Sequence, residues 1–531
     1  MIFQSLIASA ATVPAWITIL FAILLVGLVA SLALEEKLHA KKSIIAAAFA
    51  VLCLFIGTLT NVLSFQNVVV GSYEAEPQNR VEVQVVKDPE SAAVETIVIE
   101  PKKEPSNKQE PGDSAESHTP TPDDLTLHIG GHEISMPTYI PGIDWSVIAI
   151  ILGSSLFVDV TSRSGLFSWI AIRVTKLSQG DPLRLLCFYG VMTVLFSAVL
   201  NNVTAMIIVG SLTVVSLEKL ERRHQLMPFL LIEGLLTNIG GLLTLISSVP
   251  NIIVGTTANI SFTSFLLKSS PYVVIATAVT LAMGAALFRI KGLQSETEKL
   301  QARELVSGFD ENDGIGSWVF FKTAVLMLGV FILLIAGASA LPVINKLGMG
   351  FVAISMAVIM LLMFRSEVDK FYRAVDWDLI GFFMALFVVI YVMEQAQVLH
   401  WIGLALQGVM GDVTLAKATS LDATTLLVGS AAFSSVTDNI PLSAMLASIL
   451  HDLNTPDSSG LWWSVIFGAN LGGNITPIGS ASTLVAVTIM HKHDVKMSFM
   501  GFVKLAILFA LVQIVLAIAY VILIVPLIPS F

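Results

Sequence analysis

Two stretches of the chain carry polar, helix-breaking residues inside otherwise apolar sequence. The stretch from Ser434 to Ala486 contains TDNIP and ANLGGNITPIGS, and the stretch from Val199 to Gly255 contains LNNVTAMII and NIGGLLTLISSVPN. Irregular, polar backbone at membrane depth is tolerated only where it faces protein or a water-filled cavity. We therefore expect both stretches to contribute to a binding site, and the repetition of the same layout is the main argument for it.

The chemistry of such a site depends on the atoms that the helix breaks present. Helix N-termini offer unpaired N–H groups and partial positive charge, which suit an anion. Unwound carbonyl groups and the oxygens of Asn, Ser and Thr suit a sodium ion, and glycine lets the backbone approach a ligand closely. These residue types alone do not choose between the two. The candidate substrate- and ion-binding residues are Asn201, Asn202, Thr204, Asn238, Gly240, Gly241, Ser247, Ser248, Asn251, Thr437, Asp438, Asn439, Asn470, Gly472, Gly473, Asn474, Thr476 and Ser480.

Two acidic residues are candidates for carrying the coupling ion. A carboxylate at membrane depth costs at least about 2.5 kcal/mol, so Asp438 needs a cation, a proton or a hydrogen-bonded tip around it. The alternative is that Asp438 only caps the helix that follows. Glu233, one turn before Thr237 and Asn238, could be a second proton carrier or an acid bonded to neighbouring helices.

Three further acids, Asp159, Glu394 and Asp422, lie near predicted span ends. We interpret them as solvated boundary charges.

The composition indicates a membrane protein. Of 531 residues, 55% are hydrophobic and only 13% charged, and the mean hydropathy is +0.82, so a soluble fold would lack polar surface. Cys53 and Cys187 lie in apolar runs, which argues against a disulfide scaffold or a thiolate metal site. The sequence contains no HExxH, GxSxG or Walker A motif, so we expect neither an enzyme nor an ATP-driven pump. We predict no cofactor beyond a possible bound Na+ near Asn202, Asp438 and Asn439, and no nucleic-acid partner.

Nearly all of the net charge of −10 lies in one segment. Between Ser72 and Gly142 there are 14 acidic and 5 basic residues, a net of −9. Its acidic, Pro-rich composition predicts a largely disordered extracytoplasmic loop over 72–142. Within it, LTLHIGGHEISM predicts a short β-hairpin about Gly130 and Gly131. The flanking His128 and His132 could bind a metal, but two histidines without further ligands are more typical of surface residues.

Basic residues between the apolar runs set the orientation, because Lys and Arg are retained on the cytoplasmic side. The predicted order starts with two transmembrane helices in 1–71, with the N-terminus outside. Residues 143–288 complete a first repeat with a re-entrant inner hairpin over 183–217. A cytoplasmic linker over 289–317 leads to a second repeat over 318–531, with an outer hairpin over 424–451 and the C-terminus also outside. Two of the inward spans are predicted from Pro271 to Phe288 and from Gly350 to Phe364. The expected fold is an all-α polytopic membrane protein of two inverted repeats, each with about five transmembrane helices, one re-entrant helical hairpin and a broken helix.

Four motifs in this order resemble those of the ion transporter superfamily. LNNVTAMII and TDNIPLSAM are similar to its hairpin tips, and NIGGLLTLISSVPNIIVG and NLGGNITPIGSASTLVAV to its broken helices. The superfamily includes arsenite permeases, NhaD-type sodium/proton antiporters, the melanosomal P protein, citrate carriers and divalent-anion/sodium symporters. The resemblance covers roughly the whole chain except the acidic loop. It implies a scaffold and a mobile transport domain, usually in a homodimer, that work by an elevator-like movement.

The sequence departs from this pattern at two expected carboxylates. P-protein-like and NhaD-like members carry Asp-Asn at the first tip, where this chain has Asn201 and Asn202. They often have IGDxxN where this chain has ISSVPN, ending at Asn251. A mechanism that needs both of those acids therefore does not transfer directly.

The function expected from the sequence is secondary active ion transport, coupled to Na+ or H+, in a cell membrane, which we expect to be a bacterial inner membrane. The expected partners are a small ion substrate, the coupling ion, membrane lipids and a second copy of the chain. A sodium-coupled citrate, dicarboxylate or other anion symporter is the alternative that the missing acids favour. An ion channel is the alternative from another class.

Overall fold

The computed structural model describes residues 13–38, 40–63, 67–70, 84–85, 97–98, 132–135, 140, 142–338, 341–364, 375–410, 419–437 and 439–529. The chain forms two units. Met1–Leu63 and Pro141–Phe531 make up the larger unit, and Ser64–Ile140 makes up the smaller one.

Helices form the larger unit, and ten of those in the described ranges are long and apolar enough to cross a membrane. The first half contains α2 (Ala15–Ala33), α3 (Glu35–Leu38), α4 (Lys42–Leu59), α5 (Trp145–Arg163), α6 (Leu166–Ser178), α7 (Pro182–Val199), α8 (Asn202–Lys219), the 3-10 turn η2 (Arg223–Gln225), α9 (Leu226–Gly240), α10 (Val249–Thr257) and α11 (Phe262–Leu287). The second half contains α12 (Glu296–Ser307), α13 (Trp318–Ala336), α14 (Pro342–Met363), α16 (Trp377–Gln395), α17 (Val398–Met410), α18 (Ser420–Ser434), α19 (Asn439–Asp452), α20 (Gly460–Gly472), α21 (Ala481–Lys492), α22 (Phe499–Leu523) and the 3-10 turn η4 (Val525–Leu527).

The two predicted hairpin tips are the points where helices end and restart. Leu200 and Asn201 have extended backbone between α7 and α8, and Asn201 Oδ1 accepts a hydrogen bond from Thr204 N at 2.8 Å, which caps α8. In the second half, α18 ends at Ser434 and α19 begins at Asn439. The two glycine-rich stretches likewise separate α9 from α10 and α20 from α21.

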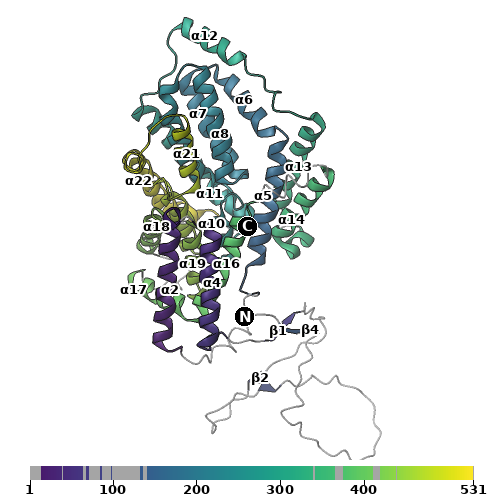
Figure 1. Cartoon of the computed structure of the whole chain (residues 1–531), viewed down its shortest axis with the longest axis vertical. Helices are drawn as coiled ribbons and strands as arrows, with labels where there is room; N and C mark the ends of the chain where they lie inside the picture. The colour runs from purple at the N-terminus through teal and green to yellow at the C-terminus, as the bar shows by residue number, and fades with distance from the viewer. Residues whose placement is uncertain are drawn as a thin grey trace, which may run out of the picture. The chain divides into compact units, whose positions relative to one another are not determined.

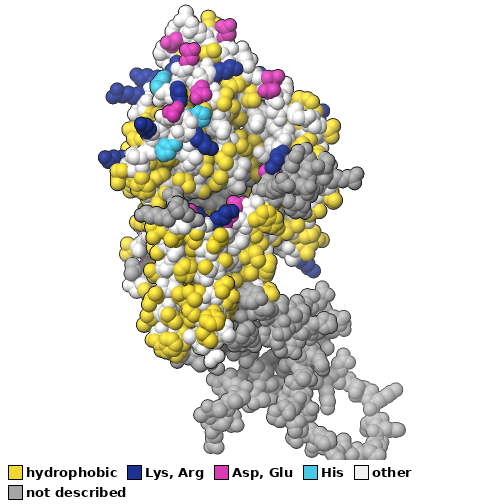
Figure 2. Space-filling model, in the orientation of Figure 1, with side chains coloured by type: hydrophobic (Ala, Val, Ile, Leu, Met, Phe, Trp, Pro, Cys, Tyr) yellow, Lys and Arg dark blue, Asp and Glu magenta, His cyan; other side chains and the backbone are white. Residues whose placement is uncertain are grey.

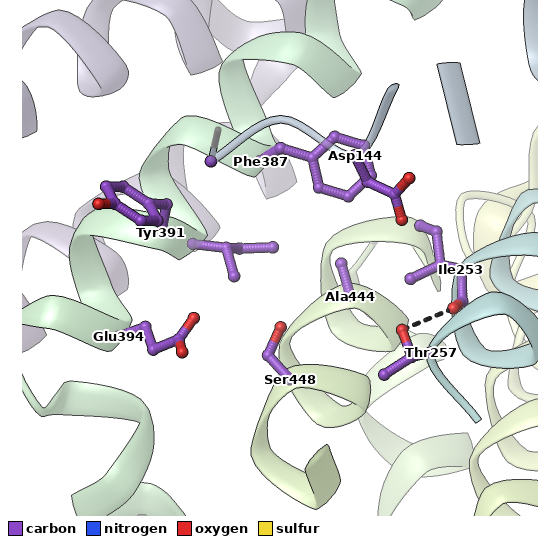
Figure 3. Close-up of a pocket in the computed structure, with 10 residues that line it drawn as sticks. Asp144, Ile253, Thr257, Phe387, Tyr391, Glu394, Ala444 and Ser448 are labelled. Atoms are coloured by element: carbon purple, nitrogen blue, oxygen red, sulfur yellow. Dashed lines mark hydrogen bonds between the residues drawn. The ribbon is translucent and has the colours of Figure 1, made fainter. Parts of the chain in front are cut away.

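The hairpins pack on the broken helices. The helices α7 and α8 contact α9, and α18 and α19 contact α20, while α21 packs against both α8 and α9 (Figure 1). Outside this group, α5 packs along α14 and α16 packs along α4. The helix α16 also approaches α10 and α19, where the three helices and the start of α5 line a cavity of about 220 Å³ (Figure 3). The helices α9 and α20 therefore each pack against the hairpin of their own half.

Two predicted helix starts differ from the bounds of the helices. We expected α11 to begin at Pro271, but it begins at Phe262, because Ser261 caps it by accepting from Ser264 N at 3.1 Å, and Pro271 lies inside the helix. We expected the next inward span to begin at Gly350, whereas α14 begins at Pro342, which suits the first turn of a helix. Gly348, with φ +78°, interrupts the helical backbone within α14, so the helical stretch after this break begins close to the predicted Gly350.

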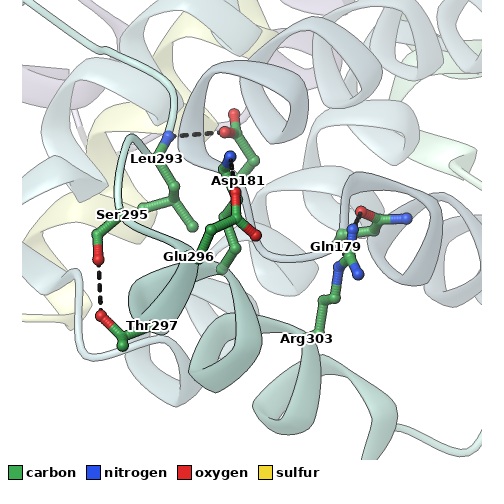
Figure 4. Close-up of polar contacts among 8 residues, drawn as sticks. Gln179, Asp181, Leu293, Ser295, Glu296, Thr297 and Arg303 are labelled. Carbon is green, nitrogen blue, oxygen red and sulfur yellow. Dashed lines mark hydrogen bonds and ion pairs between the residues drawn. The ribbon is translucent and has the colours of Figure 1, made fainter.

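The segment between the halves folds onto the turn that joins α6 to α7 (Figure 4). Arg303 of α12 donates from Nε and Nη2 to Gln179 Oε1, at 3.0 and 2.7 Å. Leu293 N donates to Asp181 Oδ2 at 2.8 Å, while Asp181 Oδ1 accepts from Arg184 N at 2.9 Å and so caps α7. The predicted linker thus contains a helix and is fastened to the first half.

The smaller unit contains short antiparallel strands. The strand β1 (Asn67–Val70) pairs with β4 (His132–Ser135), and β2 (Gln84–Val85) pairs with β3 (Ile97–Val98). The predicted hairpin about Gly130 and Gly131 would pair β4 with residues 125–129, which lie outside the described residues, as does His128. The partner that the structure assigns to β4 is β1, whose NVVV sequence has high strand propensity.

Hydrophobic and charged side chains cover different parts of the surface of the larger unit. Figure 2 shows hydrophobic side chains over the face formed by α2 and α4, and Lys, Arg, Asp, Glu and His side chains gathered over the end where α12 and α21 lie. The hydrophobic face is what a membrane-embedded surface requires.

Candidate functional site

Asn238, near the end of α9, is the centre of a buried polar cluster. Its Oδ1 accepts hydrogen bonds from Asn202 Nδ2 at 3.3 Å, Ser480 Oγ at 2.9 Å and Ser482 Oγ at 3.2 Å. Its Nδ2 donates to Asn474 Oδ1 at 2.8 Å. The cluster therefore joins the tip of the first hairpin to the break in the second broken helix.

Asn470, near the end of α20, is the centre of a second cluster. Its Oδ1 accepts from Ser248 Oγ at 2.8 Å, and its Nδ2 lies 2.9 Å from Asn251 Oδ1 and 2.8 Å from Ile466 O. Asn251 Nδ2 in turn donates to Gly241 O at 2.6 Å. All of these side chains are buried, so the hydrogen bonds replace the water that they lose on folding.

Each cluster combines an asparagine from one half of the chain with a serine from the other half, and the arrangement is reciprocal. Asn470 lies 232 positions after Asn238, and Ser480 lies 232 positions after Ser248. Ser480 donates to Asn238, and Ser248 donates to Asn470. Each half thus supplies the serine that bonds the other half's asparagine, as expected of two structural repeats that meet at their helix breaks.

The hairpins hold their broken helices through equivalent serines. Ser197 Oγ lies 2.7 Å from Thr237 O, and Ser434 Oγ lies 2.6 Å from Ala469 O. Ser197 Oγ is also 2.7 Å from Asn202 Oδ1, and its one proton can be donated to either oxygen. Both serines are four positions before the tip.

Equivalent threonines make the next contact. Thr244 Oγ1 donates to Ala198 O at 2.6 Å, and Thr476 Oγ1 donates to Ser435 O at 2.6 Å. In both contacts the hairpin residue repeats after 237 positions and the broken-helix residue after 232. The two halves therefore hold their hairpins through the same local contacts.

Two equivalent glycines, Gly240 and Gly472, allow each hairpin to lie close to its broken helix. A Cβ on Gly240 would lie 2.6 Å from Val194 O, and a Cβ on Gly472 would lie 2.8 Å from Ala431 Cα. Any larger residue would push the hairpin backbone away from the broken helix. Among the other predicted glycines, Gly241 faces the Asn202 side chain and Gly473 faces Gly479.

The remaining predicted residues hold the breaks and tips in shape. Ser247 Oγ lies 2.6 Å from Gly241 O and 2.7 Å from Thr244 O within the first break. Thr437 Oγ1 donates to Phe433 O at 2.9 Å, so it closes the end of α18. Asn439 is the first residue of α19 and is partly buried, and Asp438 lies outside the described residues.

Glu233 lies in α9, two turns or less from the first cluster, and is fully buried. Thr213 Oγ1 of α8 donates to its Oε1 at 2.6 Å. Its Oε2 has no hydrogen-bond partner among the described residues. A buried acid with a spare oxygen is expensive to retain, so its presence needs a reason beyond packing.

The three acids interpreted as boundary charges differ from one another. Asp159 is partly buried near the end of α5 and pairs with Arg163 at 2.9 Å, in agreement with a boundary charge. Glu394 is exposed near the end of its helix, α16, and lines the cavity beside α19. For Asp422 the interpretation is wrong, because the residue is buried and forms a capping box with Thr419 at the start of α18.

Sequence reasoning missed three polar residues of the clusters. Ser197 and Ser482 belong to the first cluster, and Gln513 of α22 accepts from Asn474 Nδ2 at 2.8 Å and donates to Thr280 Oγ1 at 3.0 Å. A glutamine inside the apolar sequence of α22 was a usable signal, because polar residues in membrane helices usually face the protein interior.

In the described part of the chain, no group of three or more His, Cys, Asp or Glu side chains could hold a metal ion. The oxygens available in the clusters are amide, hydroxyl and carbonyl oxygens, which are hard, neutral ligands. Oxygen ligands of this kind suit hard cations, and unwound carbonyl groups coordinate Na+ in other transporters.

Comparisons with known proteins agree with a transporter. The CitMHS family profile, described as "Citrate transporter", matches residues 125–468. The "46 kDa membrane protein" of Mycobacterium leprae is 31% identical over 400 residues, which cover 74% of this chain and 89% of that protein. The human "P protein" is 24% identical over 455 residues, which cover 71% of this chain and 53% of that protein.

A solved structure shares the fold. The YdaH transporter of Alcanivorax borkumensis superposes with a TM-score of 0.52 over 92% of this chain and 100% of that chain, at 13% sequence identity. At this identity the likeness concerns the arrangement of helices alone.

Proposed function

Because the chain belongs to the CitMHS citrate transporter family, we propose that it is a secondary active transporter that moves a small ion through the clusters around Asn238 and Asn470, coupled to Na+ or H+. The observation that carries the proposal is the reciprocal pair of hydrogen bonds between the two halves, from Ser480 to Asn238 and from Ser248 to Asn470. Binding sites of secondary transporters lie where the broken helices of two repeats meet.

Four helix N-termini lie next to these clusters. The helices α8 and α19 begin at the two tips, and α10 and α21 begin at the two breaks. Ser248, the N-cap of α10, uses its hydroxyl for Asn470 and not for its own helix, so the first N–H groups of α10 have no side-chain cap. Such N–H groups favour a negatively charged ligand, and the amide and carbonyl oxygens beside them favour its counter-cation.

We propose that Asp438 binds the coupling ion, with Glu233 as the second candidate, because these are the two acids that the sequence places at membrane depth. A neutral cluster of amides and hydroxyls cannot release or take up a proton at physiological pH. Proton coupling therefore needs an acid beside the clusters, for which these two are our candidates, whereas sodium coupling could use the cluster oxygens together with Asp438.

We further propose that the protein is a homodimer in a cell membrane, with both termini on the extracytoplasmic side. It would work by an elevator-like movement of the hairpins and broken helices. Support for the moving group comes from the packing, since the hairpins contact the broken helices while α5 and α16 pack mainly along α14 and α4.

A second candidate is sodium-coupled uptake of citrate or another carboxylate. The description of the matching family as a citrate transporter favours it, as do the helix N-termini at the clusters. An ion channel is the alternative of another class, and it would conduct without coupling.

Everted membrane vesicles test these alternatives. With a proton gradient in place, addition of Na+ collapses the gradient if the protein exchanges Na+ for H+. Sodium-dependent uptake of labelled citrate without a proton signal supports symport. Asp438→Asn should abolish either coupled flux, and Asp310→Asn, an exposed acid of the linker, serves as the control. Flux at the wild-type rate in Asp438→Asn would overturn the assignment of the coupling site.

A further inference from the structure

A chain of three buried hydrogen bonds leads from the first cluster to α22 and α11. Asn238 Nδ2 donates to Asn474 Oδ1 at 2.8 Å, and Asn474 Nδ2 donates to Gln513 Oε1 at 2.8 Å. Gln513 Nε2 donates in turn to Thr280 Oγ1 at 3.0 Å. The exposed fraction of each of these four residues is 0% or 1%. The amides therefore depend on one another for the hydrogen bonds that they lose with water on folding.

One backbone carbonyl group fixes the direction of this chain. Asn474 Nδ2 also donates to Leu235 O, at 3.2 Å, and a carbonyl oxygen can only accept. The nitrogen of the Asn474 amide therefore lies toward Leu235 and Gln513, and its oxygen lies toward Asn238. Gln513 must then present its oxygen to Asn474, and Asn238 must present its nitrogen.

The other end of the Asn238 side chain is set by the same chain. Because its nitrogen bonds Asn474, its Oδ1 faces the donors Asn202 Nδ2, Ser480 Oγ and Ser482 Oγ. If the Asn238 amide turned over, its oxygen would face the oxygen of Asn474, and a buried acceptor without a donor is costly. Asn238 is thus held with its oxygen toward the tip of the first hairpin.

The first half of the chain has no equivalent of Asn474. Leu242 lies 232 positions before it, which is the offset between the two central asparagines. Leu242 is fully buried. An apolar residue therefore fills this place in the first helix break.

The first half also has no equivalent of Gln513. The helices α11 and α22 correspond at an offset of 237 positions, because their N-caps, Ser261 and Ser498, each accept from the backbone N–H three residues ahead. At this offset Gln513 corresponds to Ala276, which is fully buried. The repeat folds with apolar residues at both places, so the fold itself does not require the two amides, and polar groups buried in membrane helices are costly unless they have a function.

We propose that Gln513 is a positioning residue of the transport site. Acting through Asn474, it holds Asn238 with its Oδ1 toward Asn202 at the tip of the first hairpin. The consequence for transport rests on the proposed function, but the link from Gln513 to Asn238 can be measured without any transport.

Gln513→Leu tests the consequence for transport. The apolar side chain takes one acceptor away from Asn474, so Asn238 keeps its productive orientation for only part of the time. An apparent affinity falls with the fraction of protein in the competent state, and the net contribution of one hydrogen bond corresponds to about two- to tenfold. In proteoliposomes with an imposed Na+ gradient, we expect the half-saturating concentration of Na+, or of labelled citrate where citrate is taken up, to rise by about this factor while the maximal flux is retained.

Two further variants separate positioning from a merely structural role. Gln513→Glu keeps an oxygen for Asn474, so its half-saturating concentration should lie closer to the wild type than that of Gln513→Leu. Tyr520→Phe removes another buried hydrogen bond of α22, from Tyr520 Oη to Lys268 O at 2.9 Å. It should lower the stability and leave the half-saturating concentration unchanged. The proposal is overturned by an unchanged concentration in Gln513→Leu, by an equal rise in Tyr520→Phe, or by a Gln513→Glu variant that is no better than Gln513→Leu.

Unfolding of the purified protein in detergent tests the link itself. Gln513→Leu and Asn238→Ala act on one chain of hydrogen bonds, so their combined shift of the unfolding midpoint should be smaller than the sum of the single shifts. Asn470→Ala is the matched control, because it is the equivalent asparagine of the other half and shares no described hydrogen bond with Gln513; its shift should add to that of Gln513→Leu. Thr280→Val, which removes the side-chain acceptor of Gln513, takes the place of Gln513→Leu if that variant does not fold. Additive shifts with Asn238→Ala would overturn the proposal.

The two proposals fail separately. Non-additive shifts in a protein without coupled flux would remove the transport function and keep the link from Gln513 to Asn238. Coupled flux in a protein with additive shifts would remove the role of Gln513 and keep the transport function.

Discussion

The buried pair of Thr213 and Glu233 allows a quantitative test, because the second half lacks it. The positions equivalent to Thr213 and Glu233 are Leu450 and Val465, which are both apolar. Thr213 makes the one hydrogen bond that the Glu233 carboxyl group has among the described residues. Thr213→Val therefore leaves a fully buried carboxyl group unsatisfied, at a cost of about 1–3 kcal/mol in the free energy of unfolding.

Replacing both partners should cost much less. The double substitution Thr213→Leu with Glu233→Val copies the apolar pair of the second half, and removing both members of a buried hydrogen bond can be nearly neutral. We expect it to be more stable than Thr213→Val alone, although it contains one more change. Thr58→Val is the control, since the Thr58 hydroxyl is exposed and bonds to Leu54 O of its own helix; its cost should stay within about 0.5 kcal/mol.

Unfolding of the purified protein in detergent, followed by tryptophan fluorescence as a denaturant is added, measures all four proteins. The reasoning is refuted if Thr213→Val is as stable as the wild type, or if the double variant loses at least as much stability as the single one.

Three further predictions follow from single contacts. Glu233→Gln keeps a hydrogen-bond acceptor without a titrating proton, so it should fold in normal yield and lose Na+-driven proton movement; an unchanged proton signal would exclude Glu233 as the carrier. Gly472→Ala introduces a Cβ 2.8 Å from Ala431 Cα of α18, and such overpacking should destabilise the protein by about 1–3 kcal/mol, measurable in the same unfolding assay; a neutral effect would contradict the close packing. Lys176, which bonds the Glu311 carboxylate, and Arg173, at 3.7 Å, lower the pKa of Glu311 below its usual 4.5. The pair should therefore stabilise the protein above pH 4.5, and the difference between wild type and Glu311→Gln should fade as the pH falls below that value; a difference independent of pH would refute the pairing.

The sequence predicted the helix breaks because their signals are local. An asparagine such as Asn201 can accept from the backbone two or three residues ahead, which favours the start of a helix wherever it occurs. The glycine pairs beginning at Gly240 and Gly472 break helical sequence for equally local reasons. Both signals occur twice in the same order, so the two-repeat fold could be predicted before any contact was known.

The contacts across the two halves could not be predicted in the same way. The bond from Ser480 to Asn238 joins residues that are far apart in the chain, and nothing in either local sequence names the other. The role of Ser197 depends on the same tertiary packing, because its hydroxyl points at the broken helix rather than at its own tip.

The wrong start of α11 has a different cause. Proline usually ends or starts a helix, but a helix held by its neighbours can continue through it, and Pro271 lies inside α11 because tertiary packing overrides the local preference. Gly348 behaves as the local sequence predicts, because its φ of +78° interrupts the helical backbone of α14.

Coupled flux through purified protein is the most direct test of the central claim that the two halves form one transport site at Asn238 and Asn470. In proteoliposomes with an imposed Na+ gradient, the wild type should drive either proton movement or uptake of labelled citrate against its own gradient. Asn238→Ala and Asn470→Ala should each abolish that flux, because each removes the residue that receives the other half's serine. Full coupled flux in both variants would contradict the claim.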